Sequence, residues 1–82
     1  RDTLILYPNP GDGLFKFEVS EGLQIHQIEV FDIRGRFLLE HRYDNSVPNL
    51  EYKLNLSEYQ AGVYQLLIQT NGREYLKRAI IR

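Results

Sequence analysis

The chain contains no cysteine and carries almost no net charge. Without cysteine, disulfide bonds and thiolate metal sites are excluded. A formal net charge of -1 over 82 residues gives no general electrostatic reason to bind nucleic acid or an anionic membrane. No apolar run approaches the roughly 18 residues that a membrane-spanning helix needs. At 82 residues the chain is one domain with one hydrophobic core. Because its net charge is so low, any partner has to be recognised by shape or by a local patch.

Most of the chain alternates between apolar and polar residues with the period of a β-strand. The segment "GLFKFEVS", residues 13–20, alternates three apolar side chains with Lys16 and Glu18. The same period occurs in "LEYKLNLS" (50–57, with Leu50, Tyr52, Leu54 and Leu56 apolar), "HQIEVFD" (26–32) and "GVYQLLIQT" (62–70). Less regular but rich in β-forming residues are "TLILY" (3–7), "RFLLEHRY" (36–43) and "REYLKRAII" (73–81). The pattern predicts about seven strands.

Turn signals separate these segments. Asn71-Gly72 predicts a tight two-residue hairpin, and Arg34-Gly35 after Asp32 predicts a second tight reversal. Seven short strands joined by turns, in a chain of this size, predict an all-β fold. We expect an immunoglobulin-like antiparallel β-sandwich.

The stretch "LYPNPGDG", residues 6–13, ends the first predicted strand abruptly. Pro8 and Pro10 fix φ and donate no backbone hydrogen bond, so the strand cannot continue through them. Gly11 and Gly13 can adopt positive φ. The stretch is therefore predicted to be a turn between the first two strands.

A second turn is predicted in "LSEYQAGVY", residues 56–64. Ser57 is placed to cap one helical turn, and Gly62 is placed to end it in the left-handed conformation. Tyr64 then re-enters the core. Its hydroxyl could form a tyrosine corner by bonding back across the connection, or Tyr64 could be one more large core residue; both interpretations need the same fold.

The sequence offers little for a metal site. His26 and His41 lie on separate predicted strands and show no ligand spacing, so half-exposed strand histidines are the simpler interpretation. In "NPGDG" only Asn9 and Asp12 could supply side-chain oxygen to calcium, which needs several such ligands. We therefore expect no metal site and no cofactor.

A catalytic site is not predicted either. The serines in turn or capping contexts, none in a G-x-S-x-G motif, are Ser20, Ser46 and Ser57. The aspartates close to Gly or Asn in the sequence, where a carboxylate stabilises a turn, are Asp12, Asp32 and Asp44. We expect no hydrolase activity.

The last ten residues form a locally basic segment. Its charged residues are Arg73, Lys77, Arg78 and Arg82, against Glu74 alone. Such a segment is either an edge strand whose cations discourage aggregation or a recognition signal.

Four motifs occur in a defined order along the chain. They are "LYPNP..G" (6–13), "IEVFDIRGR" (28–36), "LNLSEYQAGVYQLLI" (54–68) and the terminal "LKRAIIR" (76–82). Together they resemble the C-terminal sorting domain of proteins that Gram-negative bacteria export through the type IX secretion system. The resemblance covers nearly the whole chain.

The residues that match the family pattern are Pro8, Pro10 and Gly13 for its Pro-x-Pro-x-x-Gly turn, Gly35 in the second motif, Gly62 and Tyr64 for its Gly-x-Tyr, and Lys77 for its terminal Lys. The family's tail often has two adjacent lysines. Here Arg78 follows Lys77, which keeps the charge but changes the donor geometry.

The resemblance implies a non-catalytic sorting signal rather than an enzyme. In such proteins a cargo domain precedes the sandwich, and a leader brings the precursor to the periplasm. The outer-membrane translocon then recognises the folded sandwich, and a sortase-type cysteine peptidase commonly removes it and joins the cargo to surface lipopolysaccharide. Because the chain begins with Arg1 and not Met, we expect residues 1–82 to be a single domain excised from a longer secreted precursor.

The terminal strand is the expected recognition element. A free edge can be bound by strand addition, with side-chain charge giving selectivity. On this interpretation residues 75–82 carry the signal, with Lys77 and Arg78 as exposed charged determinants and Ile80 and Ile81 as anchors.

The alternative function is a carbohydrate-binding or adhesive β-sandwich appended to a secreted enzyme, and a small enzyme or inhibitor is a third choice. A sugar platform needs two or three coplanar rings on one exposed face. The candidate rings are Phe31, Phe37, Tyr43, Tyr59 and Tyr75, which are scattered over several predicted strands and turns.

Overall fold

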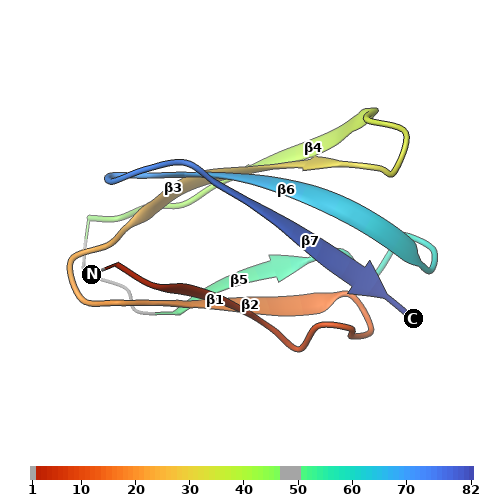
Figure 1. The fold of residues 1–82 in the computed structure, drawn as a ribbon, viewed down its shortest axis with the longest axis horizontal. Coiled ribbons are helices and arrows are strands. Elements are labelled where there is room, and N and C mark those ends of the chain that lie inside the picture. The colour runs from red at the N-terminus through yellow and green to blue at the C-terminus, as the bar shows by residue number, and fades with distance from the viewer. Residues whose placement is uncertain (1, 47–50) are drawn as a thin grey trace.

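In the computed structural model, which describes residues 2–46 and 51–82, seven strands form two facing sheets (Figure 1). The strands are β1 (Leu4–Tyr7), β2 (Leu14–Val19), β3 (Ile25–Phe31), β4 (Phe37–Arg42), β5 (Glu51–Asn55), β6 (Gly62–Thr70) and β7 (Tyr75–Ile81). Over these described ranges there is no helix long and apolar enough to cross a membrane.

All the strand pairs are antiparallel, and they divide into a three-stranded sheet, β1-β2-β5, and a four-stranded sheet, β4-β3-β6-β7. The predicted all-β immunoglobulin-like sandwich is therefore confirmed. In a constant-type immunoglobulin domain the fourth strand joins the first sheet, whereas here β4 pairs with β3. As a result β4 and β7 are the two edges of the larger sheet.

The core forms because alternate side chains of both sheets point toward each other. Phe15 and Phe17 of β2 are 1% and 0% exposed, whereas Lys16 between them is exposed. The other buried core residues are Leu4, Val19, Leu23, Ile25, Ile28, Val30, Tyr52, Leu54, Leu56, Tyr64, Leu66, Ile68, Tyr75, Ala79 and Ile81. The predicted inward positions agree with this list, except that Leu50 lies outside the described residues.

The open side of the sandwich between β4 and β5 is closed by polar aromatic contacts. The Tyr43 hydroxyl donates to the Lys53 carbonyl at 2.7 Å, and the Tyr52 hydroxyl donates to Asn45 Oδ1 at 2.6 Å. The two rings meet edge to face, with centroids 4.9 Å apart. Burial, and secondarily the neighbouring Tyr52, raises the pKa of Tyr43.

The turn after β3 is organised by Asp32, as predicted. Its side-chain oxygens accept from the backbone N–H groups of Arg34 and Arg36, both at 2.9 Å, and from Arg36 Nε. The hydrogen bond from the Arg36 backbone is the main cause that lowers the pKa of Asp32. Gly35 has a φ of 84°, which suits the last position of a three-residue hairpin loop.

The hairpin predicted at Asn71-Gly72 is wrong in its length. Four residues, 71–74, join β6 to β7, and neither Asn71 nor Gly72 has positive φ, which a two-residue type I′ turn requires. The cause is that the Asn71 side chain bonds elsewhere. It accepts from the Gln24 N–H at 2.8 Å and donates to the Gly22 carbonyl at 2.9 Å, which ties this loop to the β2–β3 connection.

Candidate functional site: the terminal strand and the loop beside it

The terminal strand β7 lies at the edge of the four-stranded sheet (Figure 1). Its side chains alternate between the two faces. Tyr75, Ala79 and Ile81 are buried against the core, whereas Leu76 and Ile80 point outward and are 65% and 37% exposed. The expected anchoring role thus fits Ile81, while Ile80 is a surface residue.

Lys77 and Arg78 point to opposite faces of the sheet, because adjacent strand residues alternate. Arg78 is exposed on the outer face, beside Gln65 of β6. Lys77 is half-buried on the inner face, in register with the fully buried Leu66. The expectation that both side chains are exposed is therefore wrong for Lys77, and Arg78 is the outward charge.

The outer edge of β7 is partly covered by residues 8–12, which we call the proline loop. The Asn9 side chain donates to the Arg78 carbonyl at 2.7 Å and accepts from the Ile80 N–H at 2.9 Å. Gly11 continues the pairing: its N–H donates to the Ile80 carbonyl, and its carbonyl accepts from the Arg82 N–H, both at 2.9 Å. The terminal strand is therefore not a free edge along its whole length, which corrects the expectation from the sequence.

The two prolines explain why the chain leaves the first sheet at this point. Pro8 and Pro10 have no N–H to donate, so the strand pairing of β1 stops at Tyr7. Both prolines are exposed and follow cis peptide bonds. Between them Asn9 is held against β7, so the proline loop connects the two sheets.

Position 13 requires glycine because its backbone lies close to the backbone of Leu56 and Ser57. A Cβ added at Gly13 would lie 2.7 Å from the Cα of Ser57 and 3.0 Å from the carbonyl carbon of Leu56. The Gly13 carbonyl accepts from the Leu56 N–H at 2.7 Å, and its φ is 106°. Gly13 therefore joins the β1–β2 loop to the β5–β6 connection.

The turn after β5 differs from the one predicted. The Leu56 carbonyl accepts from the Tyr59 N–H at 3.0 Å, and Asn55 Oδ1 accepts from both the backbone N–H and the hydroxyl of Ser57. Asn55, and not the predicted Ser57, therefore supplies the side-chain oxygen that caps this turn. Gly62 has a positive φ, as predicted, but its value of 158° lies far from the left-handed helical region. Because Gly62 begins β6, the predicted left-handed end of the turn is wrong.

Tyr64 forms a tyrosine corner. Its ring is buried, and its hydroxyl donates to the Gln60 carbonyl, four residues upstream, at 2.6 Å. Between the two possibilities left open by the sequence, the structure shows the hydrogen-bonded one.

We expect Tyr64→Phe to lower the free energy of unfolding by about 1 to 2 kcal/mol, because the buried ring stays and the Gln60 carbonyl loses its donor. Tyr59→Phe is the control, since among the described residues the Tyr59 hydroxyl has no hydrogen-bond partner. Its unfolding free energy should change by less than about 0.5 kcal/mol. Equal thermal unfolding of both variants would contradict a stabilising corner.

The motif residues gather at one end of the sandwich. Ile81 is the register partner of Gly62 and forms a parallel bridge with Gly11. A shallow hollow of about 290 Å³ lies between the Gly35 turn and the tyrosine corner. Figure 1 shows these connections at the end that carries the C-terminus, with the N-terminus at the other end.

The chain matches a known protein family over almost its whole length. Residues 5–82 match the family described as secretion system C-terminal sorting domain. The chain belongs to this family. A comparison with curated proteins gave no match.

The sorting domain is a C-terminal signal for type IX secretion, so the resemblance seen in the sequence is confirmed. Membership implies a preceding cargo domain, interaction with the type IX secretion system, and export to the cell surface or the extracellular space. Sorting domains of this family are non-catalytic. The sugar-binding alternative receives no support.

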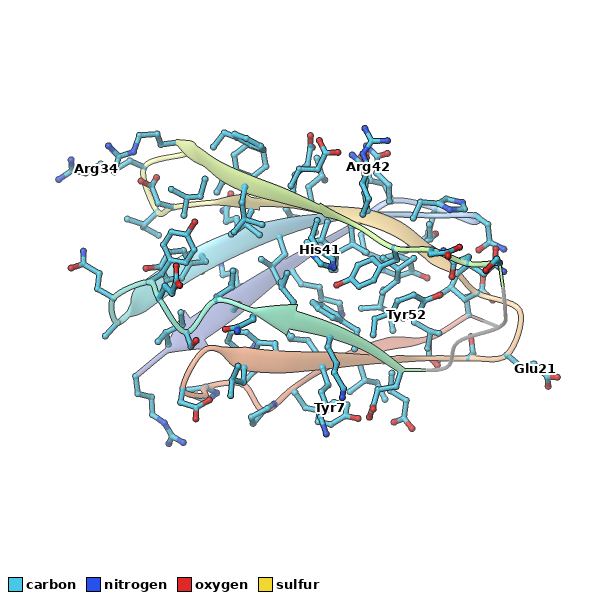
Figure 2. All side chains as sticks on the ribbon, turned by 180° about the vertical axis from the view of Figure 1, so that it is seen from behind. Tyr7, Glu21, Arg34, His41, Arg42 and Tyr52 are labelled. Atoms are coloured by element: carbon cyan, nitrogen blue, oxygen red, sulfur yellow. The ribbon has the colours of Figure 1, made fainter. Side chains whose placement is uncertain are left out.

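Several of the side chains that could carry chemistry in this sorting domain have structural contacts instead. His41 projects from β4 on the side where Tyr52 lies (Figure 2) and packs against the Tyr43 ring, with centroids 4.5 Å apart. Asp12 accepts from the Leu14 N–H, and Asp44 from the Ser46 N–H, both as turn carboxylates. In the part of the chain that the structure describes, no three His, Cys, Asp or Glu side chains gather as a metal site.

The candidate aromatic platform is not formed by this sorting domain. Phe31 and Phe37 meet edge to face at an interplanar angle of 70°, and Tyr59 and Tyr64 are tilted by 56°. Tyr75 is buried, and the guanidinium of Arg73 lies 4.6 Å above its ring. Neither of the two pairs is coplanar.

The sequence did not identify Asn9 and Gly11 as partners of the terminal strand. The sequence indicates Asn9 only as a possible calcium ligand, yet both the nitrogen and the oxygen of its amide bond to β7. One signal was available, because Asn9 stands between two residues that cannot donate a backbone hydrogen bond.

Proposed function

We propose that this domain, residues 1–82, directs an upstream cargo domain through the outer-membrane type IX translocon, and that the outer face of β7 around Arg78 is the recognition element. The precursor passes through the periplasm, and a sortase-type peptidase acts on the junction with the cargo. The domain itself contributes no catalytic residue and no cofactor. It binds no nucleic acid and does not insert into the membrane.

The observation that carries this proposal is the positive charge of Arg78 on the outward side of β6 and β7. The outward positions on β6 and β7 are Val63, Gln65, Leu67, Gln69, Leu76, Arg78 and Ile80. Arg78 is the single charged residue among them, and its register partner is Gln65. A partner with an acidic group is favoured there, because charge complementarity controls both encounter and specificity.

The position of β7 relative to the cargo supports the same proposal. A cargo domain attached at the N-terminal end would lie opposite the end at which β7 finishes (Figure 1). The motif glycines and prolines, with Tyr64, hold that far end together. Their proposed role is to present the terminal strand rather than to contact the translocon.

Charge reversal at Arg78 tests the proposal. We expect Arg78→Glu to reduce surface display of a fused reporter by about tenfold, the factor that corresponds to roughly 1.4 kcal/mol of binding. Arg78→Lys should keep most of the display because it keeps the charge. The fusions are compared in a host with a type IX system, and reporter at the cell surface is quantified.

Arg34→Glu is the matched control, since it makes the same change in charge at an exposed residue of the β3–β4 turn (Figure 2). Each purified domain is melted to establish equal folding, because exposed substitutions normally change stability by less than about 0.5 kcal/mol. Equal display of the Arg78→Glu and wild-type fusions would remove this charge from the signal. Lys77 is left unchanged because it is half-buried.

A further inference from the structure

The edge of β7 is open only between Leu76 and Arg78. The N–H and C=O of Ile80 bond to the proline loop and hence face away from β6. The β6–β7 register is regular, and successive strand residues alternate the direction of these groups, so those of Leu76 and Arg78 also face outward. Of these, the Arg78 carbonyl is taken by Asn9.

Three outward groups are therefore left: the N–H and C=O of Leu76 and the N–H of Arg78. No described residue bonds to any of them. An unpaired row of this kind is a template for pairing with another extended chain. We call residues 76–78 the open segment.

The neighbouring part of the same edge already binds an extended segment. Asn9 and Gly11 occupy the outward groups from the Arg78 carbonyl to the Arg82 N–H, and Gly11 bridges Ile81 in parallel. The proline loop therefore shows that this edge accepts a strand. It also fixes where an incoming strand has to stop.

The sheet face beside the open segment is apolar and carries one positive charge. Leu76 is 65% exposed, and its register partner Leu67 is half-buried beside it. Val63 and Ile80 form a second apolar pair, and Arg78 lies between the two pairs. An incoming strand with apolar side chains and one carboxylate would match this surface.

We propose that the export machinery binds this domain by strand addition to the open segment, using a short extended segment that carries an acidic side chain opposite Arg78. This rests on the proposed function. The main-chain hydrogen bonds are made by Leu76 and Arg78, the apolar contacts by Leu67 and Leu76, and the charge contact by the Arg78 guanidinium. The proline loop limits the pairing to the segment before the Arg78 carbonyl.

Proline at position 76 separates strand addition from side-chain recognition. Leu76→Pro removes an N–H that faces outward, so it blocks an incoming strand and leaves the β6–β7 hydrogen bonds in place. Leu76→Ala is the matched control, because it also loses the leucine side chain but keeps the N–H. We expect the Leu76→Pro fusion to reach the cell surface about tenfold less than the Leu76→Ala fusion.

Equal display of Leu76→Pro and Leu76→Ala, with equal melting of the two domains, would overturn strand addition. The proposed function would still stand if Arg78→Glu lowered display in the same assay. If Arg78→Glu also matched wild type, the proposed recognition of the outer face of β7 would fail as well.

Hydrogen exchange in the wild-type 82-residue chain tests the open segment without any substitution. We expect the amide hydrogens of Leu76 and Arg78 to exchange at least about tenfold faster than that of Ile80, which is bonded to Asn9. Equal protection of Leu76 and Ile80 would mean that the edge is closed. That result would overturn the proposal even if Leu76→Pro did not fold.

Discussion

Replacing Gly13 with alanine is expected to lower the free energy of unfolding by about 3 to 5 kcal/mol. A φ of 106° strains any residue with a Cβ, which costs about 1 to 3 kcal/mol. The new Cβ would also lie 2.7 Å from the Cα and 2.9 Å from the backbone nitrogen of Ser57, and such overpacking costs about 1 to 3 kcal/mol more. A chain of this length has about 4 to 12 kcal/mol of stability in total.

Gly35→Ala is the control for this experiment. Its φ of 84° imposes a similar strain, but a Cβ there meets no atom within 4 Å. We expect a loss of about 1 to 2 kcal/mol, and therefore a clearly higher midpoint of thermal unfolding than that of Gly13→Ala. Similar midpoints for the two variants would show that the contact between Gly13 and Ser57 relaxes at little cost.

The strands were predictable because each sheet has one buried and one exposed face. Phe15 and Phe17 are buried and Lys16 is exposed, as the period of two requires. The same reasoning correctly placed the Asp32 turn, where a local carboxylate bonds to N–H groups only two and four residues away. In both of these cases the cause lies within a few residues.

One failure involves partners that are distant in the sequence. Asn71 is a good turn residue, but its side chain bonds to Gln24 and Gly22, and the predicted hairpin lengthens to satisfy those contacts. Lys77 and Arg78 look equivalent as a basic pair. Adjacent strand residues point to opposite faces, and the pairing of β7 with β6 decides that Lys77 lies on the inner face and Arg78 on the outer face.

The contacts of the candidate site also depend on residues that are distant in the sequence. The proline loop could be predicted as a turn from Pro8 and Pro10, because those residues cannot extend a strand. Its pairing with β7 joins residues about 70 positions apart, so neither composition nor periodicity could indicate it. Asn9 supplies one donor and one acceptor to two outward backbone groups, a role that depends entirely on the fold.

Opening the proline loop is the second change from which we expect a large effect. A Cβ on Gly11 would lie 2.7 Å from the Pro8 carbonyl oxygen, so in Gly11→Ala the loop has to change its conformation, which we expect to break its pairing with β7. Four hydrogen bonds to the strand would be lost, each contributing about 0.5 to 1.5 kcal/mol. The expected loss of unfolding free energy is about 2 to 4 kcal/mol, measured by thermal or denaturant unfolding.

Gly72→Ala is the control for Gly11→Ala, because its nearest neighbour is the flexible end of the Asp2 side chain at 3.3 Å. We expect less than about 0.5 kcal/mol there. Asn9→Ala removes two of the four bonds without adding bulk and should cost about 1 to 2 kcal/mol. A loss for Gly11→Ala no larger than that for Gly72→Ala would show that the loop adds nothing to stability.

The same variants test whether the loop seals the strand edge. In Asn9→Ala the Ile80 N–H loses its acceptor, so its amide hydrogen should exchange as fast as that of Leu76. A longer open edge also favours pairing between copies of the chain, and we expect concentration-dependent association in sedimentation experiments. Retained protection at Ile80 would mean that Gly11 alone keeps the edge covered, and the sealing role would then belong to the backbone bridge rather than to the asparagine side chain.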